Sequence, residues 1–226
     1  MRTKTLLIAA AALAVGIASS MAQTYSQNIV GYVNTTILPS YNLLVVPVSP
    51  NTANNAEAIL PSLTSGDVLL VWNGGGYTSD YYNGPGDWYD GVTFNPISQP
   101  VLLPGQGFFY QNNTGLTKTN TFVGTVQLTN TVALSASYSL VGSTAPIGTS
   151  IESTNFNIPF TSGDVVLVWN GGGYTSDYYN GPGDWYDGVT FNPIAVPTLT
   201  VSQGLFYQNN TGHGTNWVQN VSWILQ

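Results

Sequence analysis

The stretch WNGGGYTSDYYNGPGDWYDGVTFNPI occupies residues 72–97 and recurs, letter for letter, at residues 169–194. Shorter matches keep the same offset of 97 residues: TSGDV at 64–68 and 161–165, QGFFYQNNTG at 106–115 with QGLFYQNNTG at 203–212, and YNLLV at 41–45 with YSLVG at 138–142. Because the segments between these matches kept their length, we expect two tandem units that arose by internal duplication.

The local sequence pattern within each unit is typical of β-structure. Residues 68–72 (VLLVW) form a short apolar run near glycines, which indicates a strand buried on both faces. Residues 43–48 and 107–110 have the same character, and turn-forming pairs recur roughly every 8 to 12 residues. Only residues 53–60 have helical character, enough for about two turns. The sequence therefore predicts an all-β fold of two tandem sandwich-like modules.

The expected domain organisation has three parts: a signal peptide at residues 1–22, a first β-module at 23–118, and a second β-module with a C-terminal capping strand at 119–226. A weaker pattern occurs three times: IVGYV at 29–33, FVGTV at 122–126 and, faintly, WVQNV at 217–221. Three copies of a bounding strand for two units suggest that the modules share or exchange such a strand.

The N-terminal residues have the features of a secretory signal peptide. Arg2 and Lys4 precede an apolar run at residues 6–17, and small residues at positions 20 and 22 indicate cleavage after Ala22. No later segment is apolar for long enough to cross a bilayer. We therefore expect a secreted or cell-surface protein without membrane insertion.

Charge and composition limit the partners of the mature chain. Removal of Arg2 and Lys4 leaves Lys118 as the only lysine or arginine against ten carboxylates, a formal net charge of about −9. Such a chain repels phosphate backbones, which argues against nucleic acid as a partner. Cations, neutral sugars and basic proteins remain compatible. The chain has no cysteine, so its stability must come from packing, bound ions or association.

The repeated stretch is predicted to form a hairpin around Asn83-Gly84-Pro85-Gly86. The simplest register pairs Tyr82 with Asp87, Tyr81 with Trp88, and Asp80 with Tyr89. Strand alternation then assigns the side chains to two faces: Asp80, Tyr82, Asp87 and Tyr89 on one, and Tyr77, Tyr81, Trp88 and Asp90 on the other. Both faces are aromatic, although a core covers only one of them.

An outward face of aromatic and acidic side chains suits a sugar, whose C–H faces pack on rings and whose hydroxyls need acceptors. The predicted glycan-contacting residues are the ring-bearing positions of the two hairpins: Tyr77, Tyr81, Tyr82, Trp88, Tyr89, Tyr174, Tyr178, Tyr179, Trp185 and Tyr186. The alternative is that these rings fill a strand-rich core, in which they are favoured.

The hairpin acids suggest a cation site. In the predicted register Asp80 and Asp87 lie diagonally on one face, roughly 5–8 Å apart at Cβ, and no lysine or arginine is near them in sequence. Ca²⁺ prefers such oxygen ligands. The predicted ligands are the hairpin acids and amides: Asp80, Asn83, Asp87, Asp90, Asp177, Asn180, Asp184 and Asp187. The alternative is that these acids bond their own turns, as we expect for Asp67 and Asp164.

Catalysis is disfavoured by the residues present. His213 is the only histidine and lies in a glycine-rich loop that has no counterpart in the first unit. Paired carboxylates can hydrolyse glycosidic bonds. However, Glu57 and Glu152 do not align at the offset of the repeat, and the aligned aspartates occur as two equivalent copies, whereas an active site needs two unlike acid environments.

Three motifs, QNIVGYVN, YNLLVVPV…GDVLLVWN and PGQGFFYQN, resemble a family of exported proteins from environmental bacteria. The resemblance implies export and β-modules, and it carries no catalytic or binding residue over to this chain. The leading hypothesis is a secreted, non-enzymatic binding module with two equivalent hairpin sites, for glycans and supported by calcium. The alternative is a structural protein of the cell surface or matrix whose modules associate edge to edge.

Overall fold

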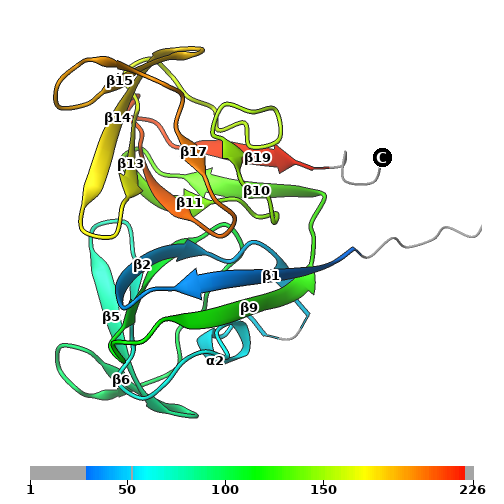
Figure 1. The fold of residues 1–226 in the computed structure, drawn as a ribbon, viewed down its shortest axis with the longest axis vertical. Coiled ribbons are helices and arrows are strands. Elements are labelled where there is room, and N and C mark those ends of the chain that lie inside the picture. The colour runs from blue at the N-terminus through cyan, green and yellow to red at the C-terminus, as the bar shows by residue number, and fades with distance from the viewer. Residues whose placement is uncertain (1–28, 52, 222–226) are drawn as a thin grey trace, which may run out of the picture.

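The computed structural model describes residues 29–51 and 53–221. The predicted signal peptide and its cleavage site lie outside these residues. The described chain is almost entirely β-structure in antiparallel sheets (Figure 1), which confirms the predicted all-β, sandwich-like fold. Within the described residues, no helix has the length and hydropathy needed to span a membrane.

The first unit contains a six-stranded antiparallel sheet in the order β2-β8-β4-β5-β6-β7 and a smaller sheet in the order β1-β9-β3. Its strands are β1 (Val30–Ile37), β2 (Ser40–Val45), β3 (Ser49–Pro50), β4 (Val68–Trp72), β5 (Tyr77–Gly84), β6 (Asp87–Asp90), β7 (Pro96–Ile97), β8 (Gly107–Asn112) and β9 (Lys118–Thr125). The predicted helical segment contains the short helix α2 (Ala56–Ile59), whose first turn is capped by the Asn55 side chain.

The second unit repeats the large sheet in the equivalent order β11-β18-β13-β14-β15-β16 and adds two two-stranded sheets, β10-β19 and β12-β17. Its strands are β10 (Thr129–Leu134), β11 (Tyr138–Gly142), β12 (Thr149–Ser150), β13 (Val165–Trp169), β14 (Tyr174–Gly181), β15 (Asp184–Asp187), β16 (Pro193–Ile194), β17 (Thr198–Leu199), β18 (Gly204–Gln208) and β19 (Thr215–Asn220).

The two small sheets close with separate strands. β9 pairs with β1 over residues 118–125 and also with β3, whereas β10 pairs with β19. Phe122 and Val126 of the FVGTV motif lie in the core of the first unit. In the described residues the motif therefore closes the first unit, and the shared bounding strand suggested by the three similar motifs is not formed.

The strands β2, β4 and β8 of the first large sheet are covered on both faces, because alternate side chains enter different cores. In β8, Phe108 and Tyr110 pack in the core of the first unit, while Phe109 between them packs in a third cluster with Leu43, Leu140 and Phe206. That cluster joins the two units. The unbroken apolar pattern of residues 68–72 has the same explanation, because Leu69 faces one core and Leu70 packs against the other cluster.

The two units dock through contacts that occur twice, related by a pseudo-twofold axis. The backbone N–H of Val45 donates to Ser202 O at 2.9 Å, and at the equivalent position Gly142 N donates to Gly105 O at 3.1 Å. The indole of Trp72 donates to Tyr138 O at 3.3 Å, and Trp169 donates to Tyr41 O at 3.1 Å. A repeated surface meeting itself is the geometry of an isologous dimer interface, formed here within one chain.

Candidate functional site: the aromatic junction

The hairpin β5–β6 has a different register from the one predicted. Gly84 pairs with Asp87, so Pro85-Gly86 is a two-residue turn in which Gly86 takes a positive φ of 74°. Asn83 is an additional residue in a β-bulge, and Tyr82 therefore pairs with Trp88. The predicted pairing was wrong by one residue because the bulge cannot be read from the alternation of side chains. The hairpin β14–β15 has the same bulge.

The observed register directs four of the ten predicted contact rings into the cores. Trp88 and Trp185 are 2% and 1% exposed, and Tyr82 and Tyr179, which pack against them, are also buried. The prediction that these four rings contact a ligand at the surface was wrong. They share a face with the sheet's core-facing side chains, and burial of so much apolar area stabilises the fold.

The other six predicted rings lie on the outer face of the hairpins. Tyr81, Tyr89, Tyr178 and Tyr186 are half-buried, and Tyr77 and Tyr174 are 38% and 39% exposed. Tyr81 packs edge-on against the exposed Phe94, as Tyr178 does against Phe191. The solvent-facing part of the predicted surface therefore consists of tyrosines alone.

Docking of the units brings the two hairpins together at one place. β5 and β14 lie on the same side of the molecule, at the left of Figure 1, and Tyr77 and Tyr174 meet there. Burial, followed by the hydrogen bond with Tyr174, raises the pKa of Tyr77 above its usual value. We call the surrounding cluster the aromatic junction; its members are Tyr41, Trp72, Tyr77, Phe109, Tyr138, Trp169, Tyr174 and Phe206.

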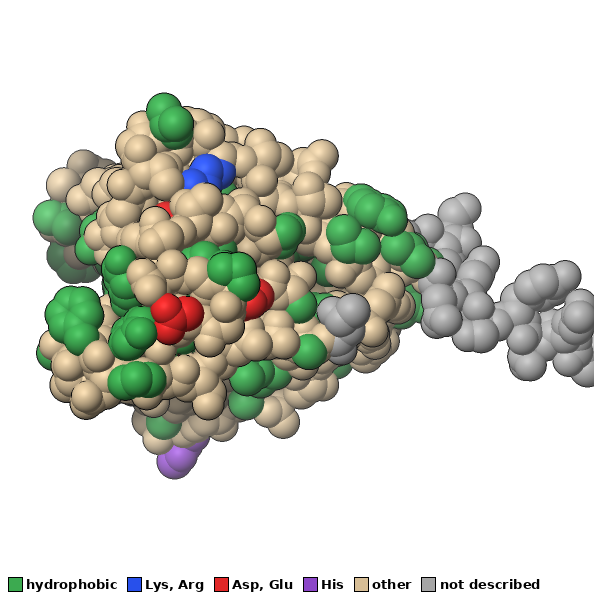
Figure 2. Space-filling model, turned by 90° about the horizontal axis from the view of Figure 1, so that it is seen from below, with side chains coloured by type: hydrophobic (Ala, Val, Ile, Leu, Met, Phe, Trp, Pro, Cys, Tyr) green, Lys and Arg blue, Asp and Glu red, His purple; other side chains and the backbone are tan. Residues whose placement is uncertain are grey.

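The rings of the junction pack edge to face, the arrangement that aromatic quadrupoles favour. Tyr77 lies 5.2 Å from Trp72 and 5.8 Å from Phe109 between ring centroids, and Tyr174 makes the equivalent contacts with Trp169 and Phe206 at 5.1 and 5.8 Å. Such packing holds the exposed tyrosines in fixed orientations. Figure 2, seen from below, shows hydrophobic side chains exposed at the left end of the molecule.

A groove of 220 Å³ opens at the centre of the aromatic junction. Its walls are the side chains of five aromatic residues and one leucine: Tyr41, Leu70, Tyr77, Phe109, Trp169 and Tyr174. No charged side chain lines it. The groove therefore presents ring faces and phenol hydroxyls. These groups can contact a ligand whose apolar surface carries polar substituents.

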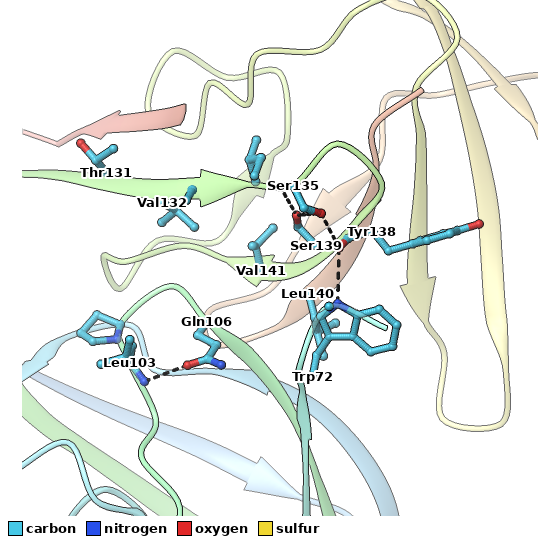
Figure 3. Close-up of a pocket in the computed structure, with 14 residues that line it drawn as sticks. Trp72, Leu103, Gln106, Thr131, Val132, Ser135, Tyr138, Ser139, Leu140 and Val141 are labelled. Carbon is cyan, nitrogen blue, oxygen red and sulfur yellow. Dashed lines mark hydrogen bonds between the residues drawn. The ribbon is translucent and has the colours of Figure 1, made fainter. Parts of the chain in front are cut away.

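Two larger clefts flank the junction at equivalent positions between the units. The first, of 460 Å³, is lined by Trp72, Leu103 and Gln106 together with residues of β10 and β11. Figure 3 shows the Trp72 indole at one end of this cleft, with its nitrogen toward the Tyr138 backbone while the Tyr138 ring points away. The second cleft, of 300 Å³, is lined by Trp169 and by residues of β1 and β2.

The linings of the two clefts differ chemically despite their equivalent positions. Leu103 and Val132 in the first cleft are replaced by Thr200 and Thr35 in the second. At a third position the exchange runs the other way, because Ser135 of the first cleft is replaced by Leu38 in the second, so the two clefts are similarly apolar. The two clefts were not predicted from the sequence, because each combines segments from both units. The sequence signal that could have indicated them is the pair of matched tyrosines, Tyr41 in YNLLV and Tyr138 in YSLVG.

The predicted calcium ligands are not brought together as one set. Asp80 pairs with Asp90 across the strands instead of lying beside Asp87, so that part of the prediction was wrong, again because of the bulge. Asn83 donates to Asp87 Oδ2 at 2.6 Å near the turn, and Asn180 does the same to Asp184. In the described parts of the chain, no three histidine, cysteine or acidic residues form a group suited to a metal ion.

Asp90 caps the loop that follows its strand. Its Oδ1 accepts hydrogen bonds from Val92 N, from Thr93 N and from the Thr93 hydroxyl, and these bonds lower the pKa of Asp90. Asp187 is bonded in the same way and its pKa is also lowered. These two acids follow the alternative interpretation, in which an aspartate satisfies the backbone of its own turn.

The environment of Asp80 is less favourable for a negative charge than that of Asp90. Burial, and then the negative charge of Asp90, raise the pKa of Asp80 from 3.8 to about 6. The same causes raise the pKa of Asp177. A raised and a lowered carboxyl side by side resemble a catalytic pair, but Asp90 is fully engaged by its loop, and neither acid lines the groove or the two clefts.

The raised pKa predicts a pH dependence of stability. Between pH 4 and about 6 the folded chain binds more protons at Asp80 than the unfolded chain, so stability falls as pH rises through this window. We expect Asp80→Asn with Asp177→Asn to remove this decrease. Relative to wild type, the double variant should therefore gain more in melting temperature at pH 7 than at pH 4. Melting curves at the two pH values measure it; an unchanged pH dependence in the double variant would contradict the assignment.

Asp67 and Asp164 were predicted to be turn residues, and each does accept a bond from the backbone N–H three residues earlier, at 2.8 Å. The structure adds that both are fully buried. Asp67 Oδ2 also accepts from Tyr110 and lies 2.5 Å from Lys118 Nζ. Asp164 accepts from the equivalent Tyr207 at 2.6 Å. These acids are structural anchors between strands.

Two glutamates that do not align in sequence perform the same task in space. Glu57 Oε1 accepts from Gly86 N and from the Trp88 indole, both at 2.8 Å. Glu152 accepts from Gly183 N, the equivalent turn glycine, at 2.9 and 3.2 Å. Sequence reasoning missed both because their spacing differs from the repeat. His213 is exposed in its loop.

Comparison with protein-family models, curated proteins and solved structures gives no match to this chain. The resemblance to exported bacterial proteins therefore stays a prediction. What the fold and the site define is a class: an all-β protein of two docked units with a partly exposed aromatic junction between them.

Proposed function

We propose that this protein is an exported, non-enzymatic binding protein whose aromatic junction contacts neutral glycans. The observation that carries the proposal is the groove in which Tyr41, Tyr77 and Tyr174 are each more than a third exposed while their neighbours hold them in place. Apolar C–H faces of a sugar pack on such rings, and phenols supply hydrogen bonds at little cost in side-chain entropy.

Charge supports a neutral ligand over an anionic one. Lys118 is the only lysine or arginine after residue 4, and its ammonium group is bound to the buried Asp67. An anionic ligand would therefore meet no available lysine or arginine and a net negative chain. The proposal differs from the two-site hypothesis drawn from the sequence, because pairing of Tyr77 with Tyr174 combines the two hairpins into one surface.

Binding to insoluble cellulose, xylan and chitin tests the proposal. We expect the wild-type protein to bind at least one of them and Tyr77→Ala with Tyr174→Ala to weaken that binding about 5- to 150-fold, since two ring contacts of about 0.5–1.5 kcal/mol each are lost. Tyr32→Ala is the matched control, because Tyr32 is a 74% exposed tyrosine outside the junction. The proposal is contradicted if the wild-type protein binds none of the three polymers, or if the junction variant binds as strongly as the wild type.

A second function, self-association as a surface or matrix protein, is favoured by one observation. β1 is an eight-residue strand at the edge of its sheet, it carries no charged residue, and Val30 and Tyr32 on it are exposed. Such an edge lacks the lysines that prevent strand pairing. Concentration-dependent assembly in light scattering without any glycan, abolished by Val30→Lys, would support this function over the first.

A further inference from the structure

The two units differ in how the charge of their buried acids is balanced. In the first unit, Lys118 Nζ lies 2.5 Å from the buried Asp67. Thr215 stands at the equivalent position of the second unit, where the equally buried Asp164 is bonded by neutral donors. Residues 119–226 contain no lysine or arginine. The second unit therefore has no such residue of its own to balance its acids.

Two of these acids act on one tyrosine of the second unit. Burial, followed by the negative charges of Glu152 and Asp164, raises the pKa of Tyr179. Both oxygens of Glu152 accept from Gly183 N, which is a neutral donor and leaves the charge of the carboxylate in place. In the part of the chain that the structure describes, neither acid forms an ion pair. The surroundings of Tyr179 therefore carry a negative potential that attracts a cation.

A cavity of 390 Å³ is bounded by the same carboxylate and the same tyrosine. Its lining consists of Glu152, Asn157, Ile158, Pro159, Phe160, Tyr179 and Pro182. Glu152 is the one charged residue of this lining. The rings of Phe160 and Tyr179 lie 5.2 Å apart between centroids. Leu63 holds the position of Phe160 in the first unit, so this aromatic residue is particular to the second unit. The cavity thus combines one unbalanced carboxylate with aromatic, aliphatic and proline walls.

These walls define the chemical class of the ligand. The carboxylate of Glu152 attracts a cation and repels an anion. Ca²⁺ needs about six to eight oxygen ligands, and in the described residues no three acidic or histidine side chains are grouped to supply them. A primary ammonium has three N–H donors, each of which needs an acceptor. A quaternary ammonium has no N–H group, and its methyl groups pack on aromatic side chains, where the ring quadrupole attracts the charge.

We propose that this cavity of the second unit binds a trimethylammonium group, such as that of choline, with its charge beside Glu152 and its methyl groups against Phe160 and Tyr179. The volume of the cavity falls in the range of about 300–1,000 Å³ typical of small-molecule sites. None of the lining residues belongs to the aromatic groove or to the two clefts. The site therefore adds a cationic ligand to the proposed glycan surface and does not depend on it.

Calorimetric titration of the protein with choline tests the proposal. The first comparison is the neutral alcohol in which a carbon atom replaces the nitrogen of choline, and the second is ethanolamine, a primary ammonium. We expect choline to bind in a saturable manner and the neutral alcohol, which has the same shape, to bind about tenfold more weakly or less, because it lacks the attraction to Glu152. Ethanolamine should also bind more weakly than choline, since its N–H donors lose water without gaining enough acceptors.

The trimethylammonium group can be free or part of a lipid headgroup, and sedimentation with phosphatidylcholine vesicles distinguishes these sources. Choline binding together with sedimentation supports the site with a lipid as its source. Choline binding without sedimentation supports the site with the free cation as its source.

Three variants test which side chains form the site. Glu152→Gln removes the charge and keeps an oxygen that can accept from Gly183 N, and Phe160→Leu introduces the residue that the first unit has at this position. Each should weaken choline binding about 5- to 30-fold, because an ionic attraction or a cation–π contact is lost. Glu57→Gln, the counterpart in the first unit, is the matched control and should leave the affinity unchanged. Melting curves check that each variant is folded.

The proposal is overturned if choline does not bind, if the neutral alcohol binds as tightly as choline, or if both cavity variants keep the wild-type affinity. The junction variant, Tyr77→Ala with Tyr174→Ala, should bind choline like the wild type. Failure of the glycan proposal and failure of the cation site are therefore observed separately.

Discussion

Trp88→Ala is expected to destabilise the protein by about 3–5 kcal/mol, the range for removing a fully buried tryptophan from a core. The indole is 2% exposed, and its ring lies 5.0 Å from that of Tyr82 between centroids. Truncation leaves a cavity and also removes the donor that satisfies Glu57. Urea unfolding followed by circular dichroism measures the loss, and it should appear without any ligand present.

Two comparisons make this result specific. Tyr89→Ala, at the next position of the same strand but half-buried on the outer face, should cost clearly less than Trp88→Ala. Trp88→Phe should cost about 1–3 kcal/mol more than Trp185→Phe, because only Trp88 loses a hydrogen bond to a carboxylate. Wild-type stability in Trp88→Ala would show that the ring belongs to the surface, as the predicted glycan contact of Trp88 requires.

Lys118→Met is expected to destabilise the fold by about 3 kcal/mol, at the lower end of the range for leaving a buried charge without its partner. Lys118 Nζ lies 2.5 Å from Asp67 Oδ2, and the two side chains are 12% and 1% exposed. The loss is limited because neutral donors, Thr64 N and the Tyr110 hydroxyl, continue to bond Asp67. Chemical denaturation of the variant measures the difference.

The second unit provides the internal comparison for this ion pair. Thr215 stands at the position equivalent to Lys118, and Asp164 is bonded by Thr161 N, Tyr207 and Asn210 N. We therefore expect Asp67→Asn combined with Lys118→Met to recover much of the stability lost in Lys118→Met, since no unpaired charge remains. Equal destabilisation in the single and double variants would mean that packing of the lysine stem, and not its charge, holds the strands.

Much of the secondary structure could be predicted from local sequence. Val68–Trp72 is a strand with the predicted bounds, the hairpin turns at Pro85-Gly86 within the predicted loop, and α2 lies inside the predicted helical segment. These features depend on residues next to one another: apolar runs, turn-forming glycine and proline, and a capping asparagine. The candidate site was predicted only in part, because six of the ten rings remain at the surface.

The sequence by itself determined the all-β class, the repeat offset and the bounds of the strand Val68–Trp72, because each depends on short-range patterns; the strand expected at residues 43–48 instead spans Ser40–Val45. Tertiary structure alone decided which rings are buried, since one bulged residue, Asn83, reverses which side chains of β6 face the core. It also decided that Tyr77 and Tyr174 share one surface, and that Glu57 satisfies its tryptophan while Glu152 does not. The physical reason is that burial and hydrogen bonding depend on partners brought together by the docking of distant segments. Local sequence patterns do not identify those partners.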